Sequence, residues 1–278
     1  MKMTNLTAEL VQAKAEQRAI PAFNIFNYIS ASAVVAAAEA CKSTVILQTS
    51  TGIVKYYGVR KLSNMIQAVK QTAGTSVYLH LDHCTSVALA KECMDCGWDS
   101  IMYDGSKLLI EDNIKNTREV VQYAHARGIT VEGELGTIVG VEEEVQVDQA
   151  QFASLDDCLH YVSESGIDYF APAVGTAHGV YKGEPHLNFD LVEDLGKRIS
   201  QPIVIHGGTG LSVSAFQEFI RRGAAKINIS TALKNAYFKG CKDYLAQFPD
   251  KASPLDLDHA MYESVRETAL YHLGIFRL

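Results

Sequence analysis

The sequence predicts an α/β protein built as a (β/α)8 barrel, the TIM-barrel architecture. Short apolar runs rich in β-forming residues alternate with amphipathic stretches of helical period, which is typical of a parallel sheet. Where a doubly wound open sheet usually has a glycine-rich turn after its first strand, this chain has Pro-Ala-Phe-Asn-Ile-Phe-Asn. Eight strands are expected, at residues 19–25, 44–50, 76–82, 100–105, 130–136, 169–175, 202–208 and 225–231.

Amphipathic helices are expected between these strands, for example at residues 59–73 and 113–126. Gly128, Gly166 and Gly223 stand where helices should end, at the position where a positive φ favours glycine.

Two further segments and the domain organisation can be predicted. The polar, acidic stretch 137–151 follows the fifth strand and is expected to be an irregular loop that serves as an active-site lid. Residues 254–278 are expected to be helical and to pack on the barrel or on a second subunit. Because no linker or shift in composition divides the chain, residues 1–278 are interpreted as one domain.

Composition excludes several classes of protein. The 278 residues are 47% hydrophobic and can bury a large core, and the net charge of −7 argues against binding nucleic acid or an anionic membrane surface. The N-terminus has no apolar leader and no apolar run is long enough to cross a bilayer, so a cytoplasmic location is expected. Six cysteines are too few for a disulfide framework, and Cys93 and Cys96 are interpreted as ordinary helix thiols.

Three histidines stand at or just beyond the ends of expected strands: His83, His178 and His206. In a barrel of this kind the carboxyl ends of all strands face one mouth, so residues far apart in sequence can meet there. Three imidazoles that leave a fourth position open are typical of a catalytic zinc site. The other histidines are interpreted as hydrogen-bonded structural residues, namely His80, His125, His160, His186, His259 and His272.

Acidic residues gather at the same predicted mouth. Asp82 adjoins a histidine, and Asp104 follows the fourth strand. Glu132 and Glu134 are two apart on the fifth strand and share a face, so at least one of them should point inward. Buried carboxylates near a dication bind it, relay protons or pair with a base.

The last two strands carry features of a phosphate site. His-Gly-Gly-Thr-Gly after the seventh strand offers backbone N–H groups, and Ser230 and Thr231 open a helix after the eighth. Oriented N–H groups at a helix N-terminus stabilise anions, and these two loops are the recurrent phosphate site of (β/α)8 barrels.

Together these motifs resemble the class II, zinc-dependent ketose-bisphosphate aldolases. The resemblance covers almost the whole chain and is carried by Leu-His-Leu-Asp-His-Cys, Glu-Gly-Glu-Leu-Gly, Val-Gly-Thr-Ala-His-Gly-Val-Tyr-Lys-Gly-Glu-Pro, His-Gly-Gly-Thr-Gly and Lys-Ile-Asn-Ile-Ser-Thr. It is closest to the fructose- and tagatose-bisphosphate aldolases of bacteria. It implies reversible cleavage of a ketose 1,6-bisphosphate to dihydroxyacetone phosphate and glyceraldehyde 3-phosphate through a zinc-stabilised enediolate, in a homo-oligomer, dimer or tetramer.

The resemblance also implies roles for individual residues. His83, His178 and His206 match the zinc ligands, while Asp104 and Glu134 match carboxylates that hold a metal in an alternative or second position, with a second divalent or a monovalent cation as the added cofactor. Asp82 matches the acid that serves the aldehyde carbonyl, and Glu142 matches the base that takes the C3 proton of dihydroxyacetone phosphate. The matching phosphate and substrate contacts are Asn24, Ser50, Gly179, Gly207, Thr209, Asn228, Ser230 and Thr231.

The chain departs from the family pattern at a few positions. Ala232 stands where an acidic residue is common, Thr137 stands where an arginine is usual, and the C-terminal tail is unlike those of the family. These positions lie where the aldehyde half should bind. Two alternatives therefore stay open, namely another phosphorylated keto sugar such as 6-phospho-5-dehydro-2-deoxygluconate, and a non-catalytic barrel that supports a partner aldolase. A Schiff-base mechanism is disfavoured because only Lys182 and Lys226 stand among the metal motifs.

Overall fold

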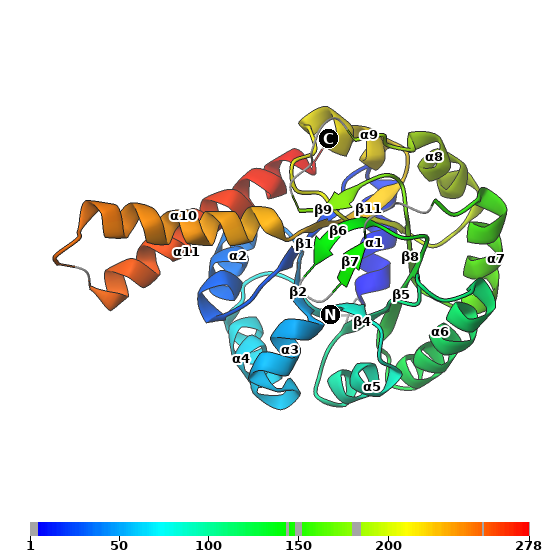
Figure 1. Ribbon diagram of the computed structural model, residues 1–278, viewed down its shortest axis with the longest axis horizontal. Helices are drawn as coiled ribbons and strands as arrows, with labels where there is room; N and C mark the ends of the chain where they lie inside the picture. The colour runs from blue at the N-terminus through cyan, green and yellow to red at the C-terminus, as the bar shows by residue number, and fades with distance from the viewer. Residues whose placement is uncertain (1–4, 143–144, 148–151, 180–184, 252, 278) are drawn as a thin grey trace.

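A closed barrel of parallel strands forms the centre of the protein, as predicted (Figure 1). The computed structural model describes residues 5–142, 145–147, 152–179, 185–251 and 253–277. Around the barrel the strands follow the order β1-β11-β10-β8-β5-β4-β3-β2. Each overlaps an expected strand, and several expected strands extend one to three residues past the end of the observed strand. The strands are β1 (Ile20–Asn24), β2 (Val45–Ser50), β3 (Val77–Cys84), β4 (Ser100–Tyr103), β5 (Thr130–Leu135), β8 (Tyr169–Pro172), β10 (Ile203–Ile205) and β11 (Ala224–Ile229).

Helices on the outside of the barrel connect successive strands. Gly128, Gly166 and Gly223 adopt positive φ angles of 71°, 77° and 113° at helix ends, as expected. The connecting helices are α2 (Tyr28–Ala40), α3 (Thr51–Tyr57), α4 (Val59–Thr72), α5 (Val87–Asp95), α6 (Ile110–His125), α7 (Leu155–Ser165), α8 (Phe189–Arg198) and α9 (Val213–Arg221).

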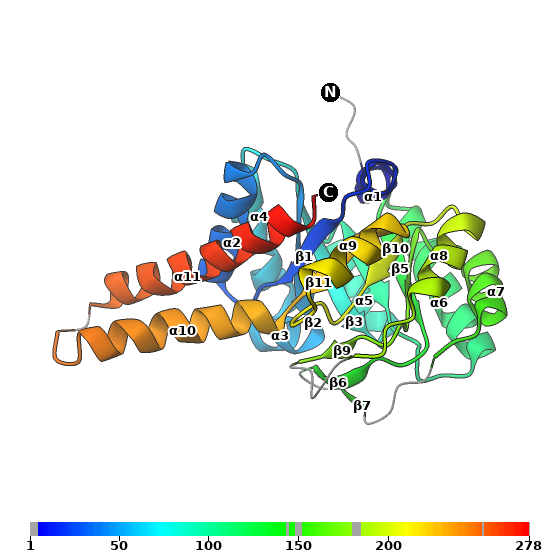
Figure 2. The ribbon, with the colours of Figure 1, turned by 90° about the horizontal axis from the view of Figure 1, so that it is seen from above.

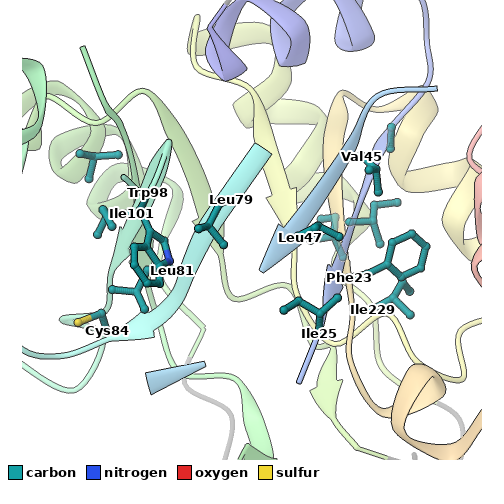
Figure 3. Packing of buried hydrophobic residues seen from close by; sticks show 14 of the residues in the cluster. Phe23, Ile25, Val45, Leu47, Leu79, Leu81, Cys84, Trp98, Ile101 and Ile229 are labelled. Atoms are coloured by element: carbon teal, nitrogen blue, oxygen red, sulfur yellow. The ribbon is translucent and has the colours of Figure 1, made fainter. Parts of the chain in front are cut away.

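Alternation along each strand separates the apolar core from the polar site. Leu79 and Leu81 of β3 pack among buried apolar side chains of the main core, together with Leu47 of β2 (Figure 3). The intervening residues of β3, His80 and Asp82, are buried and polar. Because successive side chains of a strand point to opposite faces, one face packs under the helices while the other lines the barrel interior.

An N-terminal helix that the sequence analysis did not predict closes one end of the barrel. Helix α1 (Leu6–Ala15) buries Leu6, Leu10 and Ala13 against residues near the amino ends of the strands, including Ile20 and Tyr169. The amino end is thus filled with apolar side chains, which leaves the carboxyl end as the open mouth.

The stretch predicted as an irregular loop after the fifth strand contains a hairpin, so that prediction was wrong for part of its length. Strands β6 (Val139–Glu142) and β7 (Val145–Val147) pair antiparallel, and β6 also pairs with β9 (Ala177–His178). Valines alternate here with glycine or polar residues, a period of two that favours strands even in an acidic segment.

The two C-terminal helices form an arm that extends beyond the barrel (Figures 1 and 2). Helix α10 (Thr231–Gln247) runs outward from the barrel, and α11 (Pro254–Ile275) returns along it. The helices pack so closely that a Cβ on Gly240 would lie only 2.6 Å from the Ala260 carbonyl oxygen. Within the described part of the chain, no helix combines the length and apolar character needed to span a membrane.

Candidate metal centre and active site

Three histidines from separate segments meet at the carboxyl-end mouth of the barrel. The side chains of His83, His178 and His206 each offer a nitrogen, and these nitrogens lie within 4.8 Å of one another. Ring centroids are 5.0 Å apart for His83 and His178 and 4.7 Å for His83 and His206. The structure therefore brings together the triplet that strand-end placement suggested.

His83 occupies an unusual backbone position at the end of β3. Its φ is +46°, in the left-handed region that L residues rarely adopt, and the register of β3 with β4 shifts beside it. The ring is oriented by Asp104, whose Oδ2 lies 2.9 Å from Nδ1. With Nδ1–H donating a hydrogen bond to this carboxylate, His83 presents the lone pair of Nε2 to the mouth.

His206 is oriented from the opposite side by Glu132. Its Nε2 donates to Oε1 of Glu132 at 2.7 Å, which leaves the lone pair on Nδ1. That Nδ1 lies 2.9 Å from Nε2 of His83. Two lone pairs held face to face repel each other unless an electron-pair acceptor lies near them. The donor set therefore fits a divalent cation, with His178 completing three nitrogens.

A second observation also fits a cation. Oε2 of Glu134 is buried and has no hydrogen-bond partner among the described residues, although it lies 3.9 Å from Nδ1 of His83. Burial raises the pKa of Glu134 well above its usual range, and the carboxylate of Asp104 adds to that rise. His83, Asp104 and Glu134 also place one donor atom each within 4.8 Å of one another. A cation would compensate this buried carboxylate.

Carboxamides surround Asp82, which is buried beside the three histidines. Nδ2 of Asn24 donates to Oδ2 of Asp82 at 2.7 Å, and Nε2 of Gln48 lies 3.2 Å from the same oxygen. Nδ2 of Asn228 lies 3.5 Å from Oδ1. These donors from β1, β2 and β11 fix the direction of the carboxylate. Ser50 pairs with Asp82 in the β2–β3 register.

A small polar pocket opens beside His178, at the loops after β10 and β11. Thr209 is held in place there because its Oγ1 accepts a hydrogen bond from the backbone N–H of Ala232 at 3.1 Å. Helix α10 begins at this pocket, and its Ser230 cap makes no side-chain hydrogen bond to the helix. The lining residues are His178, Gly179, Gly207, Gly208, Thr209, Asn228, Ser230, Thr231 and Lys234. Six of these were expected phosphate or substrate contacts.

Glu142, the expected base, ends strand β6. Its backbone pairs with Val145, and Gly140 of the same strand pairs with His178. The placement of the Glu142 side chain lies outside what the structure describes, as do Glu143, Glu144 and Lys182. The backbone alone therefore connects the expected base to the strand that carries the third histidine.

Among the buried polar residues of the interior, Gln48, His80 and Lys226 were not expected site residues, and Glu132 was expected only as one of two acids of which at least one points inward. Each stands two positions before an expected site residue on the same strand, so the period of two could have found them. His80 had been interpreted as a structural histidine, and its Nδ1 is within 2.7 Å of the Ser100 hydroxyl. Lys226 is buried in an ion pair with Glu132.

Comparison with known proteins agrees with this geometry. Residues 4–277 match the model of the family described as class II fructose-bisphosphate aldolase. A fructose-bisphosphate aldolase of Geobacillus stearothermophilus is 36% identical over 273 residues, covering 97% of this chain and 95% of that protein.

Solved structures give the same result. The YdjI aldolase of Escherichia coli K12 has 30% identity and a TM-score of 0.87, with 98% of this chain and 96% of that chain covered. A putative fructose-1,6-bisphosphate aldolase of Coccidioides immitis has 28% identity and a TM-score of 0.88, with 99% and 97% covered.

Proposed function

The chain belongs to the class II fructose-bisphosphate aldolase family, a family of aldehyde-lyases, and from that premise we propose that it is a zinc-dependent aldolase of a ketose 1,6-bisphosphate. The products would be dihydroxyacetone phosphate and glyceraldehyde 3-phosphate. The observation that carries the proposal is the approach of Nδ1 of His206 to within 2.9 Å of Nε2 of His83, beside His178.

The metal would be held by these three histidines, with Asp104 and Glu134 able to hold it in an alternative position or to hold a second cation. When bound, zinc acts as a Lewis acid that stabilises the negative charge developing on the ketone side of the substrate during C3–C4 cleavage. The chain orients the ligands through Asp104 and Glu132, whose carboxylates accept a hydrogen bond from the single N–H of each ring.

Asp82 and Glu142 would move the protons. In the cleavage direction Asp82 would accept the proton of the C4 hydroxyl as the C3–C4 bond breaks, and the amide donors around it orient its carboxylate for this task. The same group returns the proton to the aldehyde oxygen in condensation. Glu142 would exchange the proton at C3 of dihydroxyacetone phosphate, and the lid role expected for residues 137–151 would exclude water from the mouth.

The pocket beside His178 would bind the phosphate of the three-carbon unit. Backbone N–H groups of the glycine loop and of the first turn of α10 supply donors, and the helix dipole favours an anion there. The adjoining Lys234 adds a positive charge. A phosphate bound in this pocket, beside His178, would position the reacting carbons between the metal ligands and Asp82.

The identity of the sugar is part of the proposal. Fructose 1,6-bisphosphate is favoured by the names of the relatives, whereas tagatose 1,6-bisphosphate differs only in one hydroxyl configuration. Ala232 lies at the start of α10 beside the phosphate pocket and Thr137 follows β5, so both departures from the family pattern stand near the mouth. Another phosphorylated keto sugar is the alternative that these two residues keep open.

We also propose that residues 1–278 form one domain, that the protein assembles as a dimer or tetramer, and that it acts in the cytoplasm. The helical arm of α10 and α11 supports assembly, because Phe238 and Leu255 expose 59% and 79% of their surface.

Cleavage of fructose and tagatose bisphosphates, with and without a chelator, tests the proposal. Activity should disappear with EDTA and return with zinc, and the released triose phosphates identify the aldehyde partner. Activity that is unaffected by complete metal removal would refute the zinc mechanism. No cleavage of any phosphorylated ketose by the zinc-loaded protein would favour the non-catalytic barrel.

A further inference from the structure

Lys226 is a buried cation for which the proposed reaction gives no role. It lies on β11 in the barrel interior, fully shielded from solvent, and its Nζ is 2.8 Å from Oε2 of Glu132. Burying two charges costs more than a comparable apolar pair would, so a buried ion pair in itself is weak evidence for stability. The contacts of Glu132 indicate what else Lys226 does.

Glu132 connects Lys226 to the candidate metal centre. One carboxylate oxygen faces the lysine, and the other accepts the Nε2 proton of His206 at 2.7 Å. Because that proton is engaged, His206 keeps its lone pair on Nδ1, the nitrogen that faces His83. The tautomer of His206 therefore depends on how one carboxylate is oriented.

A competing ring nitrogen lies beside the same carboxylate, and it carries the proton of His80 when Nδ1 accepts from the Ser100 hydroxyl. Nε2 of His80 is 3.6 Å from Oε2 of Glu132, is buried and has no hydrogen-bond partner among the described residues. A carboxylate without Lys226 could turn toward His80. The Nε2 proton of His206 would then lose its acceptor, and the ring would populate the tautomer with the proton on Nδ1, which cannot bind a metal there.

We propose that Lys226 is a positioning residue that holds Glu132 against His206 and so selects the metal-binding tautomer of that histidine. This inference rests on the proposed function, because it takes His206 as a zinc ligand. It assigns control over the geometry of a metal ligand to a lysine that pairs with Glu132 and not with a candidate ligand itself.

The first test is the zinc affinity of Lys226→Met, measured on the metal-free protein by competition with a chelator. Positioning predicts that affinity falls about 10- to 100-fold, as is typical when a group that orients a metal ligand is removed. A purely electrostatic effect predicts the opposite change, because removing the positive charge of Lys226 from the neighbourhood of Zn²⁺ would raise the zinc affinity. Lys70→Met is the matched control, because Lys70 also pairs with a carboxylate, Asp99, but lies outside the site. It should leave zinc affinity unchanged.

The second test uses Glu132→Gln, with Lys226 in place. The amide oxygen of the new side chain should face the ammonium, so its NH₂ group faces Nε2 of His206 and selects the wrong tautomer. The ¹⁵N signals of His206 in the metal-free protein should then report a proton on Nδ1, and zinc affinity should fall. In the double variant Lys226→Met/Glu132→Gln the amide is free to turn, so part of the zinc affinity should return.

Two results would overturn the proposal. One is a Lys226→Met protein that binds zinc as tightly as the wild type or more tightly. The other is a Glu132→Gln protein in which His206 keeps its proton on Nε2, a result that stands even if Lys226→Met does not fold. Wild-type protein that fails to bind zinc would instead refute the proposed function, while the ¹⁵N signals would still report on the tautomer.

Discussion

Replacing Gly207 by alanine should damage the metal centre without touching any of its ligands. Gly207 follows His206 and has a φ of +68°, and a Cβ there would lie 2.5 Å from the carbonyl oxygen of Ala177. Ala177 precedes His178 on β9. The added methyl group therefore pushes against the strand that carries the third histidine, and either that strand or the loop after His206 must move.

The magnitude has two parts. A left-handed backbone costs a non-glycine residue about 1–2 kcal/mol, and overpacking costs about 1–3 kcal/mol more. Gly207→Ala should thus lower the free energy of unfolding by about 2–5 kcal/mol. Gly128→Ala is the matched control, because Gly128 has a φ of +71° and an added Cβ would meet nothing within 4 Å. This control should show the backbone cost alone.

Urea unfolding of both variants, together with zinc affinity and kcat/KM, provides the measurement. Only Gly207→Ala should bind zinc more weakly and lose activity, whereas Gly128→Ala should keep both. Equal losses of stability in the two variants, with zinc binding by Gly207→Ala at the wild-type level, would refute the reasoning.

Three further substitutions separate metal binding from proton transfer. Asp82→Ala should retain zinc and lower kcat/KM by about 10²–10⁴-fold, since a general acid or base contributes that much; metal analysis and steady-state rates check both parts. His206→Ala should lose zinc, and full zinc occupancy in the purified variant would contradict its assignment as a ligand. Gln48→Leu removes a donor to the Asp82 carboxylate and should lower kcat about 10- to 150-fold, because a hydrogen bond to a charged group contributes roughly 1.5–3 kcal/mol. Zinc affinity equal to the wild type is expected for Gln48→Leu, and a wild-type kcat would show that Gln48 does not orient Asp82.

The barrel and the three histidines could be predicted because their signals are local. An apolar run that ends in a histidine marks a strand end, and the barrel geometry then brings distant strand ends together. The expected histidines, Asp104 and Glu134 indeed lie around one mouth. Side-chain roles such as that of Asp82 stay predictions, since geometry places a group without measuring what it does.

Other features depended on information that a motif does not carry. Gln48 and Lys226 face the interior because of the strand period, yet a lysine or glutamine on a strand more often faces solvent, so composition pointed away from them. Helix α1 closes the amino end of the barrel through contacts with strands far along the chain, such as Tyr169, which no local pattern reveals. The hairpin of β6 and β7 was hidden by its acidic composition.

The three histidines do not share one scaffold. Those of β3 and of the segment after β10 extend from the barrel wall, whereas His178 sits on β9, which is hydrogen-bonded to β6 of the accessory sheet. An ion bound by all three histidines would connect the barrel wall to the small sheet of β6, β7 and β9, and Glu142 stands at the end of β6. Binding of the cation and the position of Glu142 would then be coupled, so that removing the ion is expected to displace Glu142 as well.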